Sequence, residues 1–177
     1  GYTPKNQPVY IDKNAAEADG IIVQCRVAPH TSFRGPYESG IMKMMTIGLG
    51  KQNGASHFHS SGIGHMAEYI PMYGNTIRTY SNVIFAVASV ENAYHDTCQI
   101  EALTNEEIPE KEPELLEYAK QRFGKILLDK CDVLVVDEIG KDINGDGADP
   151  NVTGLWTTKY GWGGLEKQMV CYLDLSE

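Results

Sequence analysis

Three histidines and one lysine that could carry out acid–base or ligand chemistry stand within thirty residues of one another: His30, Lys43, His57 and His59. A histidine titrates near neutral pH, so it can move protons or, when neutral, bind a metal. A lysine in a dry pocket can bind a carboxylate or form a covalent bond. This group predicts a site that handles protons, a metal and an anion.

A glycine-rich run, Gly48-Leu49-Gly50-Lys51, lies between the lysine and the last two histidines. It is not a P-loop, because the G-x-x-x-x-G-K-[ST] spacing is missing. Its backbone N–H groups could still donate hydrogen bonds to a phosphate. The run therefore leaves open a nucleotide- or small-molecule-binding domain without catalysis, in which the histidines are structural.

A zinc or other divalent-metal hydrolase that uses His30, His57 and His59 is a further alternative. His57 and His59 would share one face of a strand but point apart on a helix. Zinc catalysis also needs three protein ligands, and the pattern around these two histidines offers no obvious third one. The run Asp142-x-Asn144-x-Asp146-Gly147 has the alternating oxygens of a calcium loop, but its twelfth position is Thr153 rather than Glu, and we expect a Gly-rich turn there.

The elements that must position these residues are strands and helices in alternation. Continuous apolar runs predict strands at Gly20–Val27, Asn82–Val90, Asp132–Val136 and near Gln168–Leu173. Helical signals predict helices at Asp12–Ala18 and Pro113–Phe123. The alternation indicates an α/β fold with a mixed, mostly parallel sheet and flanking helices.

Two glycine-rich stretches, Gly35–Gly64 and Gly140–Gly164, each follow a predicted strand. Ligands in open α/β sheets gather beyond the carboxyl ends of the strands. We therefore expect the chemistry in these two loops, with long surface connections without function as the alternative.

Composition limits the classes of partner. With 177 residues, one compact domain is the default, and the net charge of −9 works against nucleic acid and anionic membrane surfaces. The sequence has neither an apolar run of membrane-spanning length nor a secretory signal, so we expect a cytoplasmic protein. The four cysteines are expected to be buried free thiols.

The residues between Pro8 and His30, PVYIDKNAAEADGIIVQCRVAPH, resemble the segment that leads to a catalytic histidine in the nickel-dependent lactate racemase family. The resemblance continues through RVAPHTSFRGPYESGIMKMMTIGLGKQ and, after the third predicted strand, VDEIGKDINGDGADPN. In that family a lysine tethers a nickel pincer nucleotide covalently, and a histidine sixteen residues later ligates the nickel. Lys43 and His59 have this spacing. Lys43 stands farther from His30 than the family's lysine does from its histidine, because of an insertion within GPYESGIMK.

The resemblance implies an isomerase that racemises or epimerises an α-hydroxy acid by reversible hydride transfer. The implied cofactor is a nickel pincer nucleotide of the pyridinium-3,5-dithiocarboxylic acid mononucleotide type, bound by Lys43, Gly48 and Gly50, with His59 on the nickel. His30 would be a catalytic base, and Lys141, in a K-D-I-N segment, would contact the substrate carboxylate.

The family's second catalytic histidine lies in a G-[ST]-H motif that this sequence lacks. We expect a missing N-terminal segment or a partner chain to supply it, so that this chain alone should be inactive. The family is two-lobed, which implies a break near residues 73–82 or near Gly124. A homodimer would be one way to cover an exposed strand edge.

Overall fold

The computed structural model describes residues 1–176 and divides into two compact units. The first contains Gly1–Pro29 and Arg34–Phe123, and the second contains His30–Phe33 and the chain from Gly124 onward. The chain passes from the first unit to the second at Phe123, beside one of the two positions considered for a break between lobes. Folding of the whole chain as a single domain stays a prediction.

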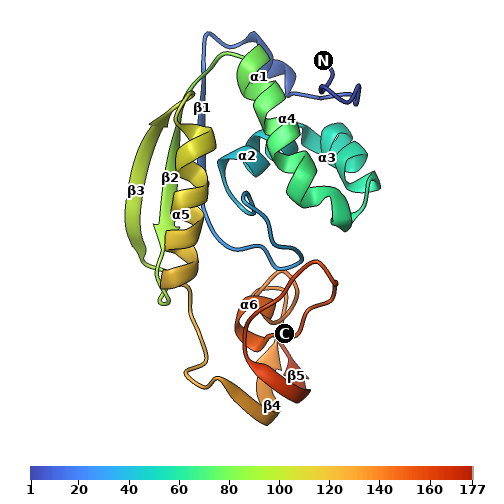
Figure 1. Ribbon diagram of the computed structural model, residues 1–177, viewed down its shortest axis with the longest axis vertical. Coiled ribbons are helices and arrows are strands. Elements are labelled where there is room, and N and C mark those ends of the chain that lie inside the picture. The colour runs from blue at the N-terminus through green and yellow to red at the C-terminus, as the bar shows by residue number, and fades with distance from the viewer. Residues whose placement is uncertain (177) are drawn as a thin grey trace. The chain divides into compact units, whose positions relative to one another are not determined.

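The first unit contains a three-stranded sheet with the order β1-β2-β3 (Figure 1). Strands β1 (Ile21–Arg26) and β2 (Val83–Glu91) are parallel, and β3 (Thr97–Thr104) is antiparallel to β2. The first two strands confirm the prediction. The sequence reasoning missed β3, because this edge strand buries only Leu103 and therefore has no continuous apolar run.

One face of this sheet carries the core of the first unit. Every second residue of β1 is buried, beginning with Ile21, and each pairs in register with a buried or half-buried residue of β2. Helix α5 (Ile108–Arg122) packs on β2 and β3 through Leu115, Leu116 and Ala119, and Figure 1 shows it lying along the sheet. The helix predicted at Pro113–Phe123 is therefore confirmed, although it begins earlier.

The connection from β1 to β2 is largely helical. It contains α2 (Ile41–Lys43), the π-helix η1 (Met44–Gly48), α3 (Lys51–Ser60), the 3-10 helix η2 (Ile63–His65) and α4 (Met66–Tyr80). The expected loop at Gly35–Gly64 is thus wrong from Ile41 onward. Close packing explains two glycines of this connection: a Cβ on Gly50, before α3, would lie 2.7 Å from the Thr46 carbonyl oxygen, and one on Gly74 of α4 would lie 2.6 Å from Met42 Sδ.

The short helix α1 (Lys13–Glu17) confirms the prediction at Asp12–Ala18. The side chain of Asp12 caps it, because Oδ1 accepts hydrogen bonds from the backbone N–H groups of Asn14 at 2.9 Å and Ala15 at 3.2 Å. An aspartate at this position satisfies N–H groups that have no partner within the helix.

The second unit contains the parallel strands β4 (Lys130–Ile139) and β5 (Glu166–Leu175), with the short helix α6 (Pro150–Thr153) between them in the chain (Figure 1). Both strands confirm the prediction and extend beyond it. The fold class is α/β, with helices beside mixed and parallel strand pairings. The strands form two separate sheets rather than the single sheet expected.

No helix within residues 1–176 is long and apolar enough to cross a membrane. All four cysteines are free thiols, but only Cys25 is buried, and Cys98 is exposed. The expectation of burial is therefore wrong for Cys98, which lies on the edge strand β3.

Candidate functional site

The predicted site residues divide between the two units. The first unit contains Lys43, Gly48, Gly50 and His59, and the second contains His30 and Lys141. The helical connection between β1 and β2 therefore holds the predicted cofactor-binding residues.

Lys43 is the last residue of α2 and is half-buried. Met42 and Met45 beside it are completely buried. Among residues 1–176, the Lys43 amine has no hydrogen-bond or ion-pair partner. Burial lowers the pKa of this amine from its ordinary value of 10.5, because removal from water disfavours the charged form. A larger fraction of the amine is therefore neutral and nucleophilic at neutral pH than for a surface lysine.

The π-helix η1 follows Lys43 directly. Its defining wide turn is closed by the Leu49 N–H, which donates to the Met44 carbonyl at 2.9 Å. The Thr46 hydroxyl lies 2.8 Å from the Met42 carbonyl oxygen and 3.1 Å from that of Ile70, so it joins this turn to α4. Single π-helical turns inside helices are frequent at functional sites.

The turn between η1 and α3 has an unusual backbone. Lys51 has a φ of 53°, in the left-handed region, directly after right-handed Gly50. Such a pair can point successive N–H groups toward an anion, and the strain costs about 1 kcal/mol. However, the Lys51 ammonium lies 3.5 Å from Asp12 Oδ2. Binding of a nucleotide phosphate by Gly48 and Gly50 stays a prediction.

The inserted segment GPYESG before Lys43 is anchored to α5. The Tyr37 hydroxyl donates to the Pro109 carbonyl at 2.6 Å. Glu38 is fully buried and pairs with Arg34 at 3.2 Å and with Lys120 of α5 at 3.1 Å. The insertion is therefore a fixed part of the first unit, and it sets where α2 begins.

Glu112 of α5 is a residue that the sequence reasoning missed. Its side chain is 1% exposed, and Oε2 accepts a hydrogen bond from the Met42 backbone N–H at 3.0 Å. Burial raises the pKa of its carboxyl to about 7. Glu112 stands in an acidic run with Glu110 and Glu114, which is typical of a solvated helix start, so no local signal distinguishes it.

His57 and His59 lie two apart on α3, and therefore point to different sides of the helix. The His57 ring centroid is 6.1 Å from that of Tyr10, while His59 packs edge-on against Phe58 at 5.8 Å. His59 is exposed. Within residues 1–176 no group of three or more His, Cys, Asp or Glu side chains could hold a metal ion. A metal bound at His59 would need its other ligands from a cofactor or another chain.

His30 lies in the second unit, in the segment after β1. Its Nδ1 accepts the Ser32 N–H at 3.0 Å, and its carbonyl accepts the Asn151 side-chain amide at 3.4 Å. Phe33, which is buried, lies with its ring centroid 4.5 Å from that of His30. An Nδ1 that accepts a hydrogen bond carries no proton, so the proton of the neutral ring is on Nε2.

Lys141 is exposed at the end of β4, and its Nζ donates to the Gly145 carbonyl at 2.6 Å. The calcium-like run beside it is held by its own hydrogen bonds. Ser176 donates to Asp142, and the Asn144 amide donates to Asp149 Oδ2 at 3.0 Å. The expected Gly-rich turn is present, and substrate binding by Lys141 stays a prediction.

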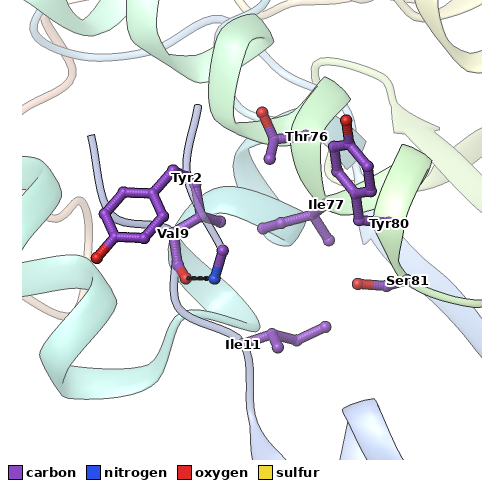
Figure 2. A pocket seen from close by; sticks show the side chains of 8 residues that line it. Tyr2, Val9, Ile11, Thr76, Ile77, Tyr80 and Ser81 are labelled. Atoms are coloured by element: carbon purple, nitrogen blue, oxygen red, sulfur yellow. Dashed lines mark hydrogen bonds between the residues drawn. The ribbon is translucent and has the colours of Figure 1, made fainter. Parts of the chain in front are cut away.

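A cavity of about 220 Å³ lies in the first unit between the N-terminal segment and the end of α4 (Figure 2). Figure 2 shows mainly apolar side chains around it, including Val9, Ile11 and Ile77. None of the predicted site residues lines it, so it is separate from the Lys43 segment.

No protein-family model matches the chain, and no curated protein matches it. The resemblance to lactate racemases therefore depends on the motifs themselves, and the function has to be argued from the chemistry of the residues.

Proposed function

We propose that this chain is the cofactor-tethering part of a nickel-pincer isomerase that racemises or epimerises an α-hydroxy acid. The observation that supports the proposal most directly is the half-buried Lys43 amine, with its lowered pKa and without a partner among residues 1–176. A lysine kept only for solubility would place its ammonium in water.

Lys43 has the properties that covalent attachment requires. An amine attacks only in its neutral form, and burial raises the neutral fraction without a nearby cation or carboxylate. The π-helical turn that follows fixes the backbone on the C-terminal side of Lys43, and the anchored insertion fixes it on the N-terminal side. Lys43 therefore stands on a segment with defined geometry.

His59 suits a metal that arrives with ligands of its own. Its ring is exposed. Among residues 1–176, its only contact with another aromatic ring is the edge-on contact with Phe58. When bound, the pincer nucleotide would supply the hydride acceptor and the remaining nickel ligands. The protein would then need to provide only one imidazole, which agrees with the lack of a three-residue metal group in residues 1–176.

In this proposal His30 and Lys141 act on the substrate. His30 in its neutral form can donate through Nε2, and it can accept a proton on Nδ1 only if it gives up the Ser32 hydrogen bond. Use of His30 as a base therefore requires the opposite tautomer or a local rearrangement. The Lys141 ammonium would bind the carboxylate of a hydroxy acid. A second base must come from outside the motifs of this sequence.

The test is co-expression of the protein with enzymes that synthesise the pincer nucleotide, followed by intact mass and nickel analysis. We expect a covalent adduct and bound nickel in the native protein, and neither in Lys43→Ala. Lys13→Ala, which changes an exposed lysine on α1, is the matched control and should keep both. An unmodified mass without nickel in every sample would contradict the proposal and favour a non-catalytic nucleotide- or small-molecule-binding domain.

A further inference from the structure

The carboxyl of Glu112, on α5, contacts the backbone at the start of α2. Its Oε2 accepts the Met42 N–H at 3.0 Å, although the two residues are 70 positions apart in the chain. A Cβ on Gly40 would lie 2.2 Å from Glu112 Oε1 and 3.1 Å from Cδ. Only glycine at position 40 leaves room for this carboxyl, so the backbone of the Lys43 segment and the side chain of Glu112 fit each other closely.

Burial of Glu112 is costly. Among residues 1–176, Oε1 is a buried side-chain oxygen without a hydrogen-bond partner. An apolar side chain would avoid the free energy that is lost when a polar atom is buried unpaired. Stability alone therefore gives no reason for a glutamate at this position.

The groups that face Glu112 come from several elements. Its charge raises the pKa of Cys25 on β1 and of Tyr37 in the anchored insertion, in each case as a smaller cause than burial. Arg78 of α4 acts on Tyr37 in the opposite direction. Glu38, the other buried carboxylate of this region, is paired with Arg34 and Lys120. Glu112 does not act directly on the Lys43 amine, because burial accounts for the lowered pKa of that amine.

We propose that Glu112 is a positioning residue for Lys43, which it holds half-buried by accepting the Met42 N–H at the start of α2. This inference depends on the proposed role of Lys43 as the attachment residue. The first N–H groups of a helix have no partner within the helix. Without the Glu112 carboxyl, the first turn of α2 opens, Lys43 reaches water, and the pKa of its amine rises back toward its ordinary value.

The experiment measures the pH profile of Lys43 acylation by an amine-directed anhydride, read by peptide mass spectrometry on the protein without cofactor. Glu112→Leu removes the hydrogen-bond acceptor and should move the Lys43 profile to higher pH. Each pH unit by which the profile moves should lower the reactivity of Lys43 at pH 8 about tenfold. Glu112→Gln keeps an oxygen acceptor and should retain the native profile. Lys13 in the same samples is the internal reference.

A second variant covers the case in which Glu112→Leu does not fold. Gly40→Ala places a methyl group on Oε1 and should shift the Lys43 profile in the same direction. If folded Glu112→Leu or Gly40→Ala keeps the native profile, the positioning role is overturned. If Glu112→Gln shifts it as far as Glu112→Leu does, the hydrogen bond to Met42 is not the cause and the proposal fails.

The same variants separate this inference from the proposed function. Adduct formation during co-expression tests the function, and the acylation profile tests the positioning without any cofactor. A shifted profile in a protein that forms no adduct would leave Glu112 as a positioning residue and remove the racemase assignment. An adduct with an unchanged profile would do the reverse.

Discussion

Two glutamates of the first unit are buried to the same extent but in different electrostatic surroundings. Glu38 is paired with two cations, whereas one oxygen of Glu112 has no hydrogen-bond partner among residues 1–176. A carboxyl buried without a partner is more readily protonated than one in water. Loss of the Glu38 side chain should therefore affect stability through its ion pairs, whereas Glu112 should make stability depend on pH.

Removal of Glu38 should be strongly destabilising. Glu38→Ala removes the buried carboxylate that Arg34 and Lys120 share, and we expect the free energy of unfolding to fall by about 3 kcal/mol. Glu114→Ala, which breaks the exposed pair with Lys111, should leave the free energy of unfolding nearly unchanged. Urea denaturation of both variants gives the comparison, and equal effects would show that the Glu38 pairs contribute little.

The stability of the protein should depend on pH through Glu112. Its carboxyl has a pKa of about 7 when folded, against an ordinary value of 4.5. The folded state therefore binds more protons than the unfolded state between these values, and stability falls as pH rises from about 4.5 to about 7. The expected loss is on the order of 3 kcal/mol.

Glu112→Gln isolates this contribution. The difference in free energy of unfolding between the native protein and the variant, measured by urea denaturation from pH 4 to pH 8, should change across the window and stay constant above it. A difference that does not vary with pH would mean that Glu112 keeps an ordinary pKa.

At the scale of elements, the contact between α2 and α4 needs a small residue. Gly74 faces Met42, where a Cβ would lie 2.6 Å from Sδ and 3.2 Å from the carbonyl oxygen. Gly74→Ala gains helix propensity but must move α2 or α4, and we expect a net loss of about 1–2 kcal/mol. Ser56→Ala on the exposed side of α3 should instead gain a few tenths. The midpoint of thermal unfolding should fall for Gly74→Ala and rise for Ser56→Ala.

The helical connection shows why glycine content misled the sequence reasoning. Glycine is a turn signal when its neighbours give no other information. Gly50 instead lies where the Thr46 carbonyl oxygen comes too close for a Cβ, and Gly54 of α3 lies in tight contact with Tyr10. A glycine can therefore be required either by the backbone conformation of a turn or by close packing between elements.

At the scale of the whole molecule, apolar side chains of β4 and β5 are exposed. They include Val133, Val135, Met169, Leu173 and Leu175. Parallel sheets are usually covered on both faces, and exposed apolar patches promote association. We expect the chain to self-associate as its concentration rises, as sedimentation velocity would show.

Two variants test whether the exposed apolar side chains of β4 and β5 cause the association. Val135→Lys places a charge among the apolar side chains and should reduce the association. Glu138→Lys replaces a side chain of β4 that is already exposed and charged, so it should have a smaller effect. A chain that remains monomeric at all concentrations would show that the exposed strands do not associate, and the homodimer would lose its support.

The sequence by itself determined the strands at β1, β2, β4 and β5, the capped helix α1, the helix α5 and the α/β class, because apolar runs and caps express local preferences of the chain. It also identified Lys43, His59, His30 and Lys141 as candidates, whose roles stay predictions. Only the tertiary structure decided that Glu112 is buried and caps α2, that Glu38 is paired, and that Lys43 is held half out of water. Burial depends on which distant elements meet, and the 70 positions between Met42 and Glu112 place that information beyond any local pattern.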